Sequence, residues 1–307
     1  MMMPIDAAWS VIKAVAGQPL FPIARHEKLP HEPGLQPGSS AAFASPLSYY
    51  GRKGWLVPQM REDFEPFRDT HSFHDVLGGS GQAIMGVNPT HGSWNDPDKP
   101  LSNFIRHLKR GLTIPDFGPN TKENFYKLVN RYNHAMATDP TSREAAQLYW
   151  ALNKRGRMGA MEHNLQGQFN TPWGGPRPQY ERAFDLTPIK RPMQKWKIQS
   201  KDFRDVMRGL DDDAFAYLDP PYPTRHGRYG RGGFGDELQR DVRDVALAHP
   251  GPVMVSNYAT PEMLDLYEDD FDIETIDRGA RANLMAGAHG RKVGGTPQEM
   301  IARRIDE

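Results

Sequence analysis

Short apolar runs alternate with amphipathic segments along most of the 307-residue chain. Runs of strand length lie at 72–77, 196–199, 214–218, 252–257, 271–276 and 299–302. Apolar residues at helical spacing predict helices from 82 onward and over 101–108, 142–153, 202–210, 236–248 and 261–267. Because strands alternate with helices, we expect an α/β fold with a mostly parallel sheet covered on both faces.

Two stretches depart from this pattern. Residues 1–45 carry a candidate helix at 9–15, and a Pro-, Gly- and Ser-rich stretch at 30–46 is typical of a linker. Residues 156–177 are rich in Gly, Asn, Gln and aromatic side chains, which predicts a β-hairpin with an exposed polar tip. We therefore expect a flexible extension over 1–45 and a hairpin inserted in the sheet pattern.

Charge is uneven along the chain, although the formal net charge is +0. Residues 151–210 hold 12 Lys and Arg against 5 Asp and Glu, and a further cluster follows at Arg225, Arg228 and Arg231. Such an excess is typical either of a solvated basic face or of contact with phosphate groups. Charge alone leaves both interpretations open.

Several kinds of site and cellular location are disfavoured because the sequence lacks the residues or segments that they need. The chain has no cysteine, which excludes disulfides and thiolate metal ligands and fits a reducing compartment. The histidines show no metal-ligand spacing, so we expect no metal site. No apolar run is long enough to span a bilayer, and the N-terminus lacks the blocks of a signal peptide. We expect a cytoplasmic protein without a membrane partner.

The block Asp219-Pro220-Pro221-Tyr222 directly follows the apolar run at 214–218. Two prolines hold a rigid, extended turn, which fixes one carboxylate and one backbone carbonyl beside an aromatic ring. The two acceptors suit the two N–H groups of a nucleobase amine, and the ring can stack on the base. The alternative is an ordinary rigid turn in which Tyr222 only packs.

A glycine-rich turn at 78–81 follows the first predicted strand. In open parallel sheets this turn commonly approaches a ligand, and an acid about 20 residues further on commonly holds ribose hydroxyls. Asp96 stands near that offset. The alternatives are a flexible turn without a ligand, and capping of a helix by Asn95 or Asp96. For Lys53, which lies upstream, the sequence leaves three interpretations: contact with a phosphate, contact with a carboxylate, or exposure to solvent.

These pieces, in this order, resemble the Dam-type (D12 class) DNA adenine-N6 methyltransferases over residues 46 to about 305. The matching segments are Tyr50 to Lys53, Asp75 to Gly81, Asn95-Asp96, the hairpin sequence Asn-Leu-Gln-Gly-Gln-Phe-Asn-Thr-Pro-Trp-Gly at 164–174, Asp202-Phe203, the identical Asp-Pro-Pro-Tyr block, Tyr229 and Ser-Asn-Tyr at 256–258. The hairpin and the Asp-Pro-Pro-Tyr block together are specific to the family.

The resemblance implies a Rossmann-like, S-adenosylmethionine-dependent methyltransferase sheet with an inserted DNA-recognition subdomain that contains the β-hairpin. The catalytic domain is expected over 46–110 and 196–307, and the target-recognition insertion over 111–195. The implied reaction moves a methyl group from S-adenosylmethionine to N6 of a flipped-out adenine in double-stranded DNA. We expect a monomer, with a dimer on DNA as the alternative.

The same resemblance implies roles for individual residues. Catalytic roles fall to Asp219, Pro220, Pro221 and Tyr222. Cofactor contacts fall to Tyr50, Lys53, Asp75, Leu77, Gly78, Gly79, Gly81, Asp96, Asp202, Phe203 and Asp219. DNA contacts fall to Arg157, Asn164, Gln168, Asn170, Pro172, Trp173, Arg177, Arg225, Arg228 and Tyr229.

The chain departs from the family's pattern in three places. Leu77 replaces the usual Phe of the glycine turn, Glu162-His163 replaces an Arg before the hairpin's Asn, and Arg177 is displaced. The recognition sequence therefore cannot be carried over from the family. Rival hypotheses are methylation of cytosine N4, methylation of a small-molecule or protein amide, and a DNA-binding protein with a decayed catalytic site.

Overall fold

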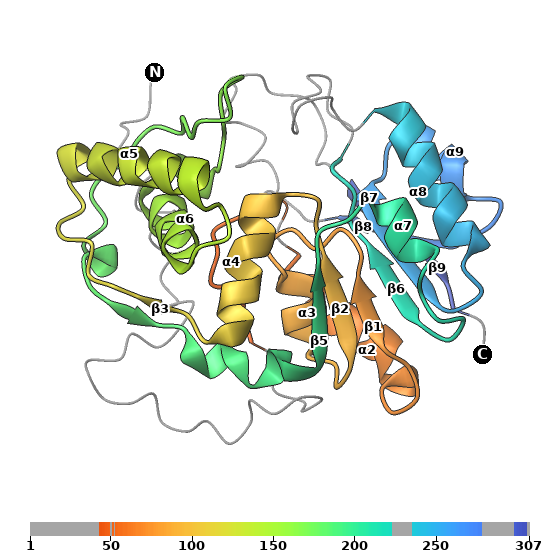
Figure 1. Ribbon diagram of the computed structural model, residues 1–307. Coiled ribbons are helices and arrows are strands. Elements are labelled where there is room, and N and C mark those ends of the chain that lie inside the picture. Colours follow the sequence, from red (N-terminus) through yellow and green to blue (C-terminus); the bar gives the residue numbers. More distant parts are fainter. Residues whose placement is uncertain (1–42, 50, 52, 223–234, 278–297, 306–307) are drawn as a thin grey trace.

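The computed structural model describes residues 43–49, 51, 53–222, 235–277 and 298–305. A seven-stranded sheet in the order β5-β2-β1-β6-β7-β9-β8 lies at its centre (Figure 1). The strands are β1 (Phe73–Asp75), β2 (Gly92–Asn95), β5 (Trp196–Gln199), β6 (Phe215–Leu218), β7 (Val253–Tyr258), β8 (Asp272–Asp277) and β9 (Gln298–Arg304). The ladders from β5 through β7 are parallel, whereas β9 runs antiparallel to both β7 and β8.

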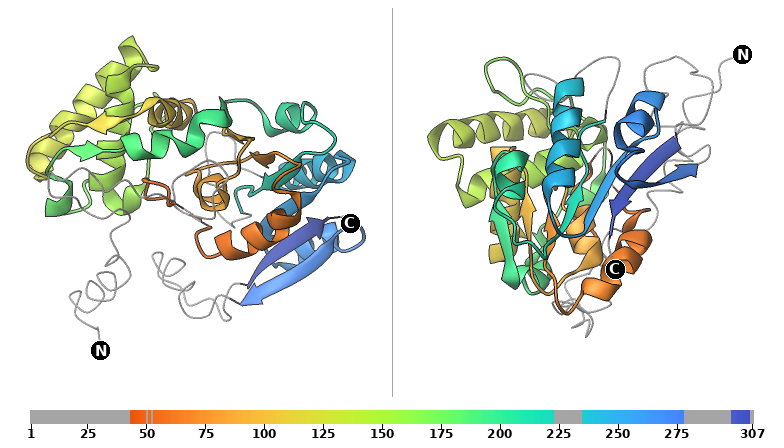
Figure 2. Two further views of the ribbon diagram at one scale, coloured as in Figure 1. Left: turned by 90° about the horizontal axis from the view of Figure 1, so that it is seen from below. Right: turned by 90° about the vertical axis from the view of Figure 1, so that its right-hand side faces the viewer.

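Side chains of the central strands alternate between two separate hydrophobic cores. In β6, Phe215 and Tyr217 enter one core, whereas Ala216 and Leu218 enter the other. The first core is covered by α2 (Val57–Phe64), α3 (Gln82–Val87) and α4 (Lys99–Arg110), and the second by α7 (Phe203–Met207), α8 (Asp236–Ala248) and α9 (Pro261–Tyr267) (Figure 2). A strand buried on both faces must be apolar at every position, as β6 is. The predicted α/β sheet with helices on both faces is confirmed.

The direction in which the chain builds the sheet reverses between β1 and β6. From β1 the chain adds β2 and then β5 on one side, and it returns to β6 and β7 on the other. At such a switch point the connections leave in opposite directions, which opens a crevice at the carboxyl ends of the strands. Asp75 ends β1 and Asp219 directly follows β6, so both carboxylates lie at this crevice.

An insertion joins α4 to β5. It contains α5 (Lys122–Thr138), α6 (Arg143–Arg155), the antiparallel pair β3 (Thr113–Ile114) and β4 (Phe184–Asp185), and the 3-10 segments η2 (Arg157–Gly159), η3 (Pro178–Tyr180), η4 (Thr187–Lys190) and η5 (Pro192–Lys195). The rings of Phe104 on α4 and Tyr149 on α6 stack with centroids 5.7 Å apart. The insertion therefore shares the first core and is anchored to the sheet through α4 (Figure 1).

The described chain begins with a segment that packs across the glycine turn. The Phe43 ring stacks on Trp196 at 6.0 Å between centroids, and Ser45 Oγ donates to the Ser80 carbonyl at 2.6 Å. The last residues of the predicted linker at 30–46 are therefore part of the fold. The helix predicted at 9–15 lies outside the described residues.

Element ends differ from the predictions by a few residues. The clearest case is the start of α4, where the Asp98 side chain accepts from the Leu101 N–H at 3.0 Å and caps the helix. Asn95 instead ends β2, and Asp96 is free of that capping role. The strand predicted at 299–302 is longer, over Gln298–Arg304.

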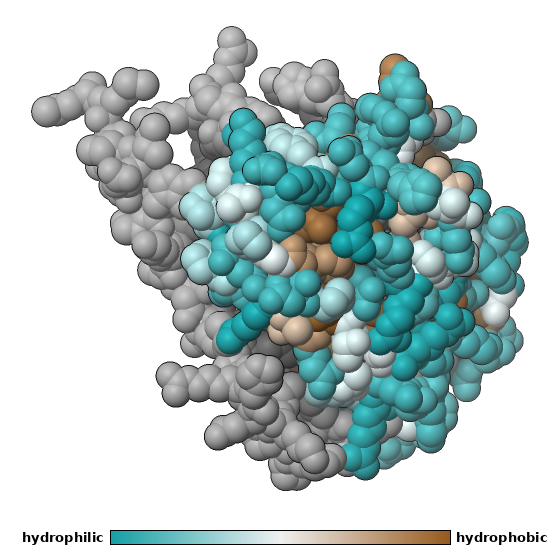
Figure 3. Space-filling model, turned by 60° about the vertical axis from the view of Figure 1, so that its left-hand side comes forward, coloured by the Kyte–Doolittle hydropathy of each residue, from teal (hydrophilic) through white to brown (hydrophobic). Residues whose placement is uncertain are grey.

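On the side of the molecule drawn in Figure 3, hydrophilic residues cover most of the described surface, and hydrophobic ones show mainly in a small central area. No helix in the described part of the chain is both long and apolar enough to cross a membrane.

Candidate active site

The Asp219 carboxylate is held from two sides at the end of β6. Its Oδ1 lies 2.9 Å from Lys53 Nζ, and the Ser256 hydroxyl donates to the same oxygen at 2.9 Å. Ser256 in turn is hydrogen-bonded to the Tyr217 hydroxyl at 2.8 Å. The Lys53 side chain is only 4% exposed and that of Asp219 is 21% exposed, so the ammonium group is buried while the carboxylate can be reached from outside.

The charge state of Asp219 depends on this pairing. Burial raises the pKa of the Asp219 carboxyl, whereas the Lys53 charge and the hydrogen bonds from Lys53 and Ser256 lower it. A positive charge at hydrogen-bond distance favours the ionised form of a carboxyl group. Lys53 therefore counteracts the effect of burial on Asp219.

Tyr222 is fixed by its hydroxyl and by its ring. The hydroxyl donates to Glu299 Oε2 at 3.0 Å, which ties the motif to β9. The ring centroid lies 4.3 Å from that of Tyr258 and 4.3 Å from Lys53 Nζ. Burial raises the pKa of Tyr222 well above its usual value, so the hydroxyl stays protonated.

The two proline carbonyls differ in their partners. The Pro221 carbonyl accepts from Gln239 Nε2 at 2.9 Å, and Gln239 Oε1 accepts from Asn257 Nδ2 at 2.9 Å. Both amide side chains are fully buried. Within the described part of the chain, no donor is bonded to the Pro220 carbonyl. The turn is therefore clamped through one carbonyl and presents the other.

Two more carboxylates lie at the same edge of the sheet. Asp75 Oδ2 accepts from the Ile84 N–H at 3.3 Å, and burial is the main cause that raises the pKa of Asp75 to about 8. Asp96 Oδ2 accepts from the Gly79 N–H at 3.0 Å, and burial raises its pKa to about 7. The neighbouring charges of Asp219 and Asp96 raise the Asp75 value further. A positive charge beside this cluster would lower these pKa values and favour the ionised carboxylates.

The three glycines of the glycine turn stand where a side chain would clash or strain the backbone. A Cβ at Gly78 would lie 2.2 Å from Trp94 Nε1, and Gly79 and Gly81 adopt φ of +46° and +75°. The turn is braced by Asn95, whose Nδ2 donates to the Val76 carbonyl at 2.9 Å. Backbone groups here can approach a ligand closely.

Three other predicted cofactor residues lie near this edge. Leu77 is half-buried against the second core, and Phe203 is buried in it. Asp202 caps α7 by accepting from the Arg204 N–H at 2.9 Å, and the Arg204 hydrogen bonds lower the pKa of Asp202. Tyr50 lies outside the described residues.

The predicted hairpin is present. Antiparallel bridges join Gly156 to Trp173 and His163 to Phe169. The Asn164 side chain closes the tip, because its Oδ1 accepts from the Gln168 N–H at 2.9 Å and its Nδ2 donates to Gln168 Oε1 at 3.2 Å. These predicted DNA contacts therefore shape the turn itself.

The other residues predicted to contact DNA fall into two groups: some side chains are exposed, and others form hydrogen bonds within the protein. Arg157, Asn170 and Pro172 are exposed. In contrast, Arg177 NH1 donates to the Lys154 carbonyl at 2.8 Å, and Trp173 Nε1 donates to Asn120 Oδ1 at 3.0 Å. The remaining candidates, Arg225, Arg228, Arg231 and Tyr229, lie outside the described residues.

Four residues that hold the motif received no role from the sequence: Gln239, Ser256, Asn257 and Glu299. Ser256 and Asn257 could have been found, because they lie near the carboxyl end of the strand after the motif strand and so reach the same sheet edge. Gln239 and Glu299 carry no such signal, since one lies inside α8 and the other on the antiparallel strand β9.

Sheet order and site define the class of protein. A parallel sheet with β9 inserted antiparallel, and with acids at the ends of β1 and β6, is a Rossmann-like methyltransferase fold. Residues 49–280 match the model of the D12 class N6 adenine-specific DNA methyltransferases. The chain belongs to this family.

Individual relatives are similar over different parts of the chain. The chain is 28% identical to the DNA adenine methylase of Escherichia coli (strain K12) over 52% of its length and 58% of that protein's length. It is 26% identical to the type II methyltransferase M1.LlaDCHI of Lactococcus lactis subsp. cremoris, over 78% of this chain and 90% of that one. The chain is 32% identical to the type II methyltransferase M.MjaIII of Methanocaldococcus jannaschii, over 42% of this chain and 44% of that one. The match thus spans little more than half of the Escherichia coli protein.

Proposed function

We propose that this protein transfers a methyl group from S-adenosylmethionine to N6 of an adenine flipped out of double-stranded DNA. The observation that carries the proposal is the pair of acceptors at the end of β6, the Asp219 carboxylate and the Pro220 carbonyl, beside the fixed ring of Tyr222. Family membership supports adenine as the base.

The two acceptors address a chemical difficulty of this substrate. The lone pair of an adenine amine is delocalised into the ring, which makes the amine a poor nucleophile. Hydrogen bonds from its two protons to Asp219 Oδ2 and the Pro220 carbonyl would draw the nitrogen toward a tetrahedral geometry. Asp219 would also stabilise the positive charge that develops on N6. The catalytic contribution is positioning and electrostatics, with no covalent enzyme intermediate.

The residues at the crevice suit S-adenosylmethionine. This cofactor supplies an electrophilic methyl group on a positively charged sulfur. Asp75, Asp96 and Asp219 gather three carboxyl groups whose pKa values are raised by burial. A cationic ligand beside them would lower these pKa values and favour the ionised carboxylates. Asp96 would hold the ribose hydroxyls of the cofactor, and the glycines at 78, 79 and 81 would let the backbone approach it closely.

The target base must leave the duplex to reach this site. Flipping costs a few kcal/mol, and stacking on the Tyr222 ring offsets about 1–3 kcal/mol of that cost. The hairpin at 156–177 would contact DNA through its exposed tip and through Arg157. Because the tip differs from the family's pattern at Glu162 and His163, we propose no particular recognition sequence.

Sequencing that detects base modification tests this proposal in cells. DNA from cells that express the chain should carry N6-methyladenine in one sequence context, and DNA from cells that express Asp219→Ala should not. Modification of cytosine would overturn the assignment of adenine as the acceptor base. Equal modification with both proteins would overturn the role of Asp219.

A further inference from the structure

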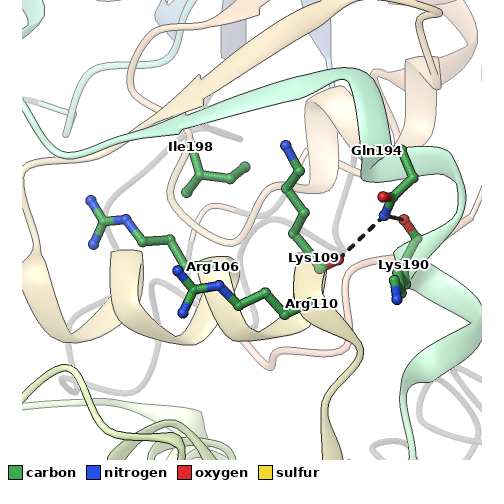
Figure 4. Close-up of a pocket in the computed structure, with 6 residues that line it drawn as sticks. All are labelled: Arg106, Lys109, Arg110, Lys190, Gln194 and Ile198. Atoms are coloured by element: carbon green, nitrogen blue, oxygen red, sulfur yellow. Dashed lines mark hydrogen bonds between the residues drawn. The ribbon is translucent and has the colours of Figure 1, made fainter.

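A basic pocket lies apart from the crevice, on the side of the sheet that ends in β5. It has a volume of about 470 Å³ and is lined by Arg106, Lys109, Arg110, Lys190, Gln194 and Ile198. Figure 4 shows the first three rising from the end of α4, with Lys190 and Gln194 on the facing segment that leads into β5. Both guanidinium groups extend in the same direction.

The pocket is far from the methyl-transfer site. Ile198 belongs to β5, whereas Asp219 follows β6, three strand spacings away across the sheet. At the usual spacing of neighbouring strands this is roughly 14 Å. Moreover, Lys109 Nζ donates to the carbonyl of Trp196, the first residue of β5, so the pocket reaches the opposite end of that strand from the crevice.

The charge of this surface is not compensated by acids. The two segments that build it, residues 99–110 and 186–201, contain Lys or Arg at 99, 106, 109, 110, 190, 191, 195, 197 and 201 and no Asp or Glu. Among the residues that the structure describes, none of the four cationic side chains of the pocket forms an ion pair. Cations gathered in this way repel one another, which an anionic ligand would relieve.

The pocket is also held in shape. Gln194 Nε2 donates to the Lys190 carbonyl at 2.7 Å and to the Lys109 carbonyl at 3.4 Å, which links the two walls. The stem of Lys190 packs on Gly111, where an added Cβ would lie 3.4 Å from Lys190 Cδ. Two guanidinium groups, those of Arg106 and Arg110, lie beside these linked segments, and a guanidinium can bind phosphate oxygens in pairs.

We propose that this pocket binds phosphate groups, and that it takes backbone phosphates of DNA at a distance from the target adenine. A ligand with a single carboxylate would neutralise only one of the four cations. A ligand with several linked phosphates, such as a DNA backbone, carries one negative charge per phosphate and can neutralise several. The proposal goes beyond the methyl-transfer function and would stand if the acceptor base were different. A free polyphosphate offers the same phosphate groups as a DNA backbone, and the experiment below distinguishes the two ligands.

The test compares two double variants of the full chain. Arg106→Gln/Arg110→Gln removes two pocket cations. Arg208→Gln/Arg240→Gln removes two exposed cations on the other side of the sheet as a control, although Arg208 pairs with Asp205 whereas the pocket arginines form no ion pair among the described residues. Fluorescence anisotropy would measure binding of a labelled duplex at several salt concentrations, with tripolyphosphate as a competing probe in a separate arm. Calorimetric binding of S-adenosylmethionine and thermal unfolding would check that each variant is folded.

The pocket variant should reduce the slope of log affinity against log salt by about 2, since each phosphate contact contributes about 0.9. The control should reduce it much less, and methyl transfer at saturating DNA should keep its rate in both. If the slope is unchanged but the pocket variant alone loses tripolyphosphate binding, the site exists and its ligand is a free polyphosphate. If the pocket variant matches the control in both arms, the proposal is wrong.

Discussion

Lys53 Nζ lies 2.9 Å from Asp219 Oδ1, and the same ammonium group lies 4.3 Å from the centroid of the Tyr222 ring. One buried cation therefore contacts two members of the Asp-Pro-Pro-Tyr block, although it precedes the first strand of the sheet. The contact gives Lys53 a role in the charge of Asp219, in addition to the cofactor contact expected from the sequence.

Replacing Lys53 should move the acidic limb of the pH–rate profile. Burial already raises the pKa of Asp219, and the Lys53 charge opposes this rise. In Lys53→Met the carboxyl would be protonated at higher pH, so activity should be lost earlier as the pH falls. The measurement is kcat/KM for methyl transfer against pH, with Lys127→Met as a control because Lys127 pairs with the exposed Glu123. An unmoved limb with only a higher KM for S-adenosylmethionine would assign Lys53 to the cofactor alone.

Removing the Gln239 clamp should slow the reaction without weakening cofactor binding. Gln239→Ala frees the Pro221 carbonyl and removes the oxygen acceptor of the buried Asn257 amide, which costs about 1–3 kcal/mol of stability. A looser turn would misplace the Pro220 carbonyl, so kcat should fall while the Kd for S-adenosylmethionine holds. Gln59→Ala is the matched control, since Gln59 bonds Asp63 on α2 away from the site. Equal kcat in both variants would show that the clamp only supports the fold.

Asp75 should make the protein less stable as the pH rises. Its folded pKa is about 8, against 3.8 for an ordinary aspartate, so the folded state binds more protons between these values. The free energy of unfolding must then decrease from about pH 4 to pH 8 and level off above the folded pKa. Asp75→Asn keeps an acceptor for the Ile84 N–H and removes the titration, so its stability should depend less on pH. Chemical denaturation at pH 5 and pH 8 checks this, and parallel curves for both proteins would contradict it.

The two hairpin arginines should behave differently. Arg157 is exposed, so Arg157→Ala should lower the salt slope of DNA binding by about 1 and leave stability unchanged. Arg177 donates to the Lys154 carbonyl, so Arg177→Ala should also destabilise the insertion by about 1 kcal/mol. Duplex binding and thermal unfolding of both variants separate the effects. Loss of S-adenosylmethionine binding in either variant would contradict the division between insertion and catalytic domain.

The sequence predicted the parallel part of the fold well, because period and length of the apolar runs are local signals. It also brought Asp75, Asp96 and Asp219 together, since acids at the ends of parallel strands must meet at one edge. It could not predict that Glu299 holds Tyr222, because β9 inserts antiparallel between β7 and β8 after a long connection. The basic pocket was equally hidden, since its walls come from both ends of the insertion.

Methyl transfer in vitro tests the central claim most directly. Purified protein would be incubated with S-adenosylmethionine labelled in its methyl group and unmethylated duplex DNA, which is then digested to nucleosides and separated. The wild-type chain should place label in N6-methyladenine, and Asp219→Ala, shown to bind the cofactor, should place none. Label in N4-methylcytosine, or an Asp219→Ala protein that works at the wild-type rate, would contradict the account.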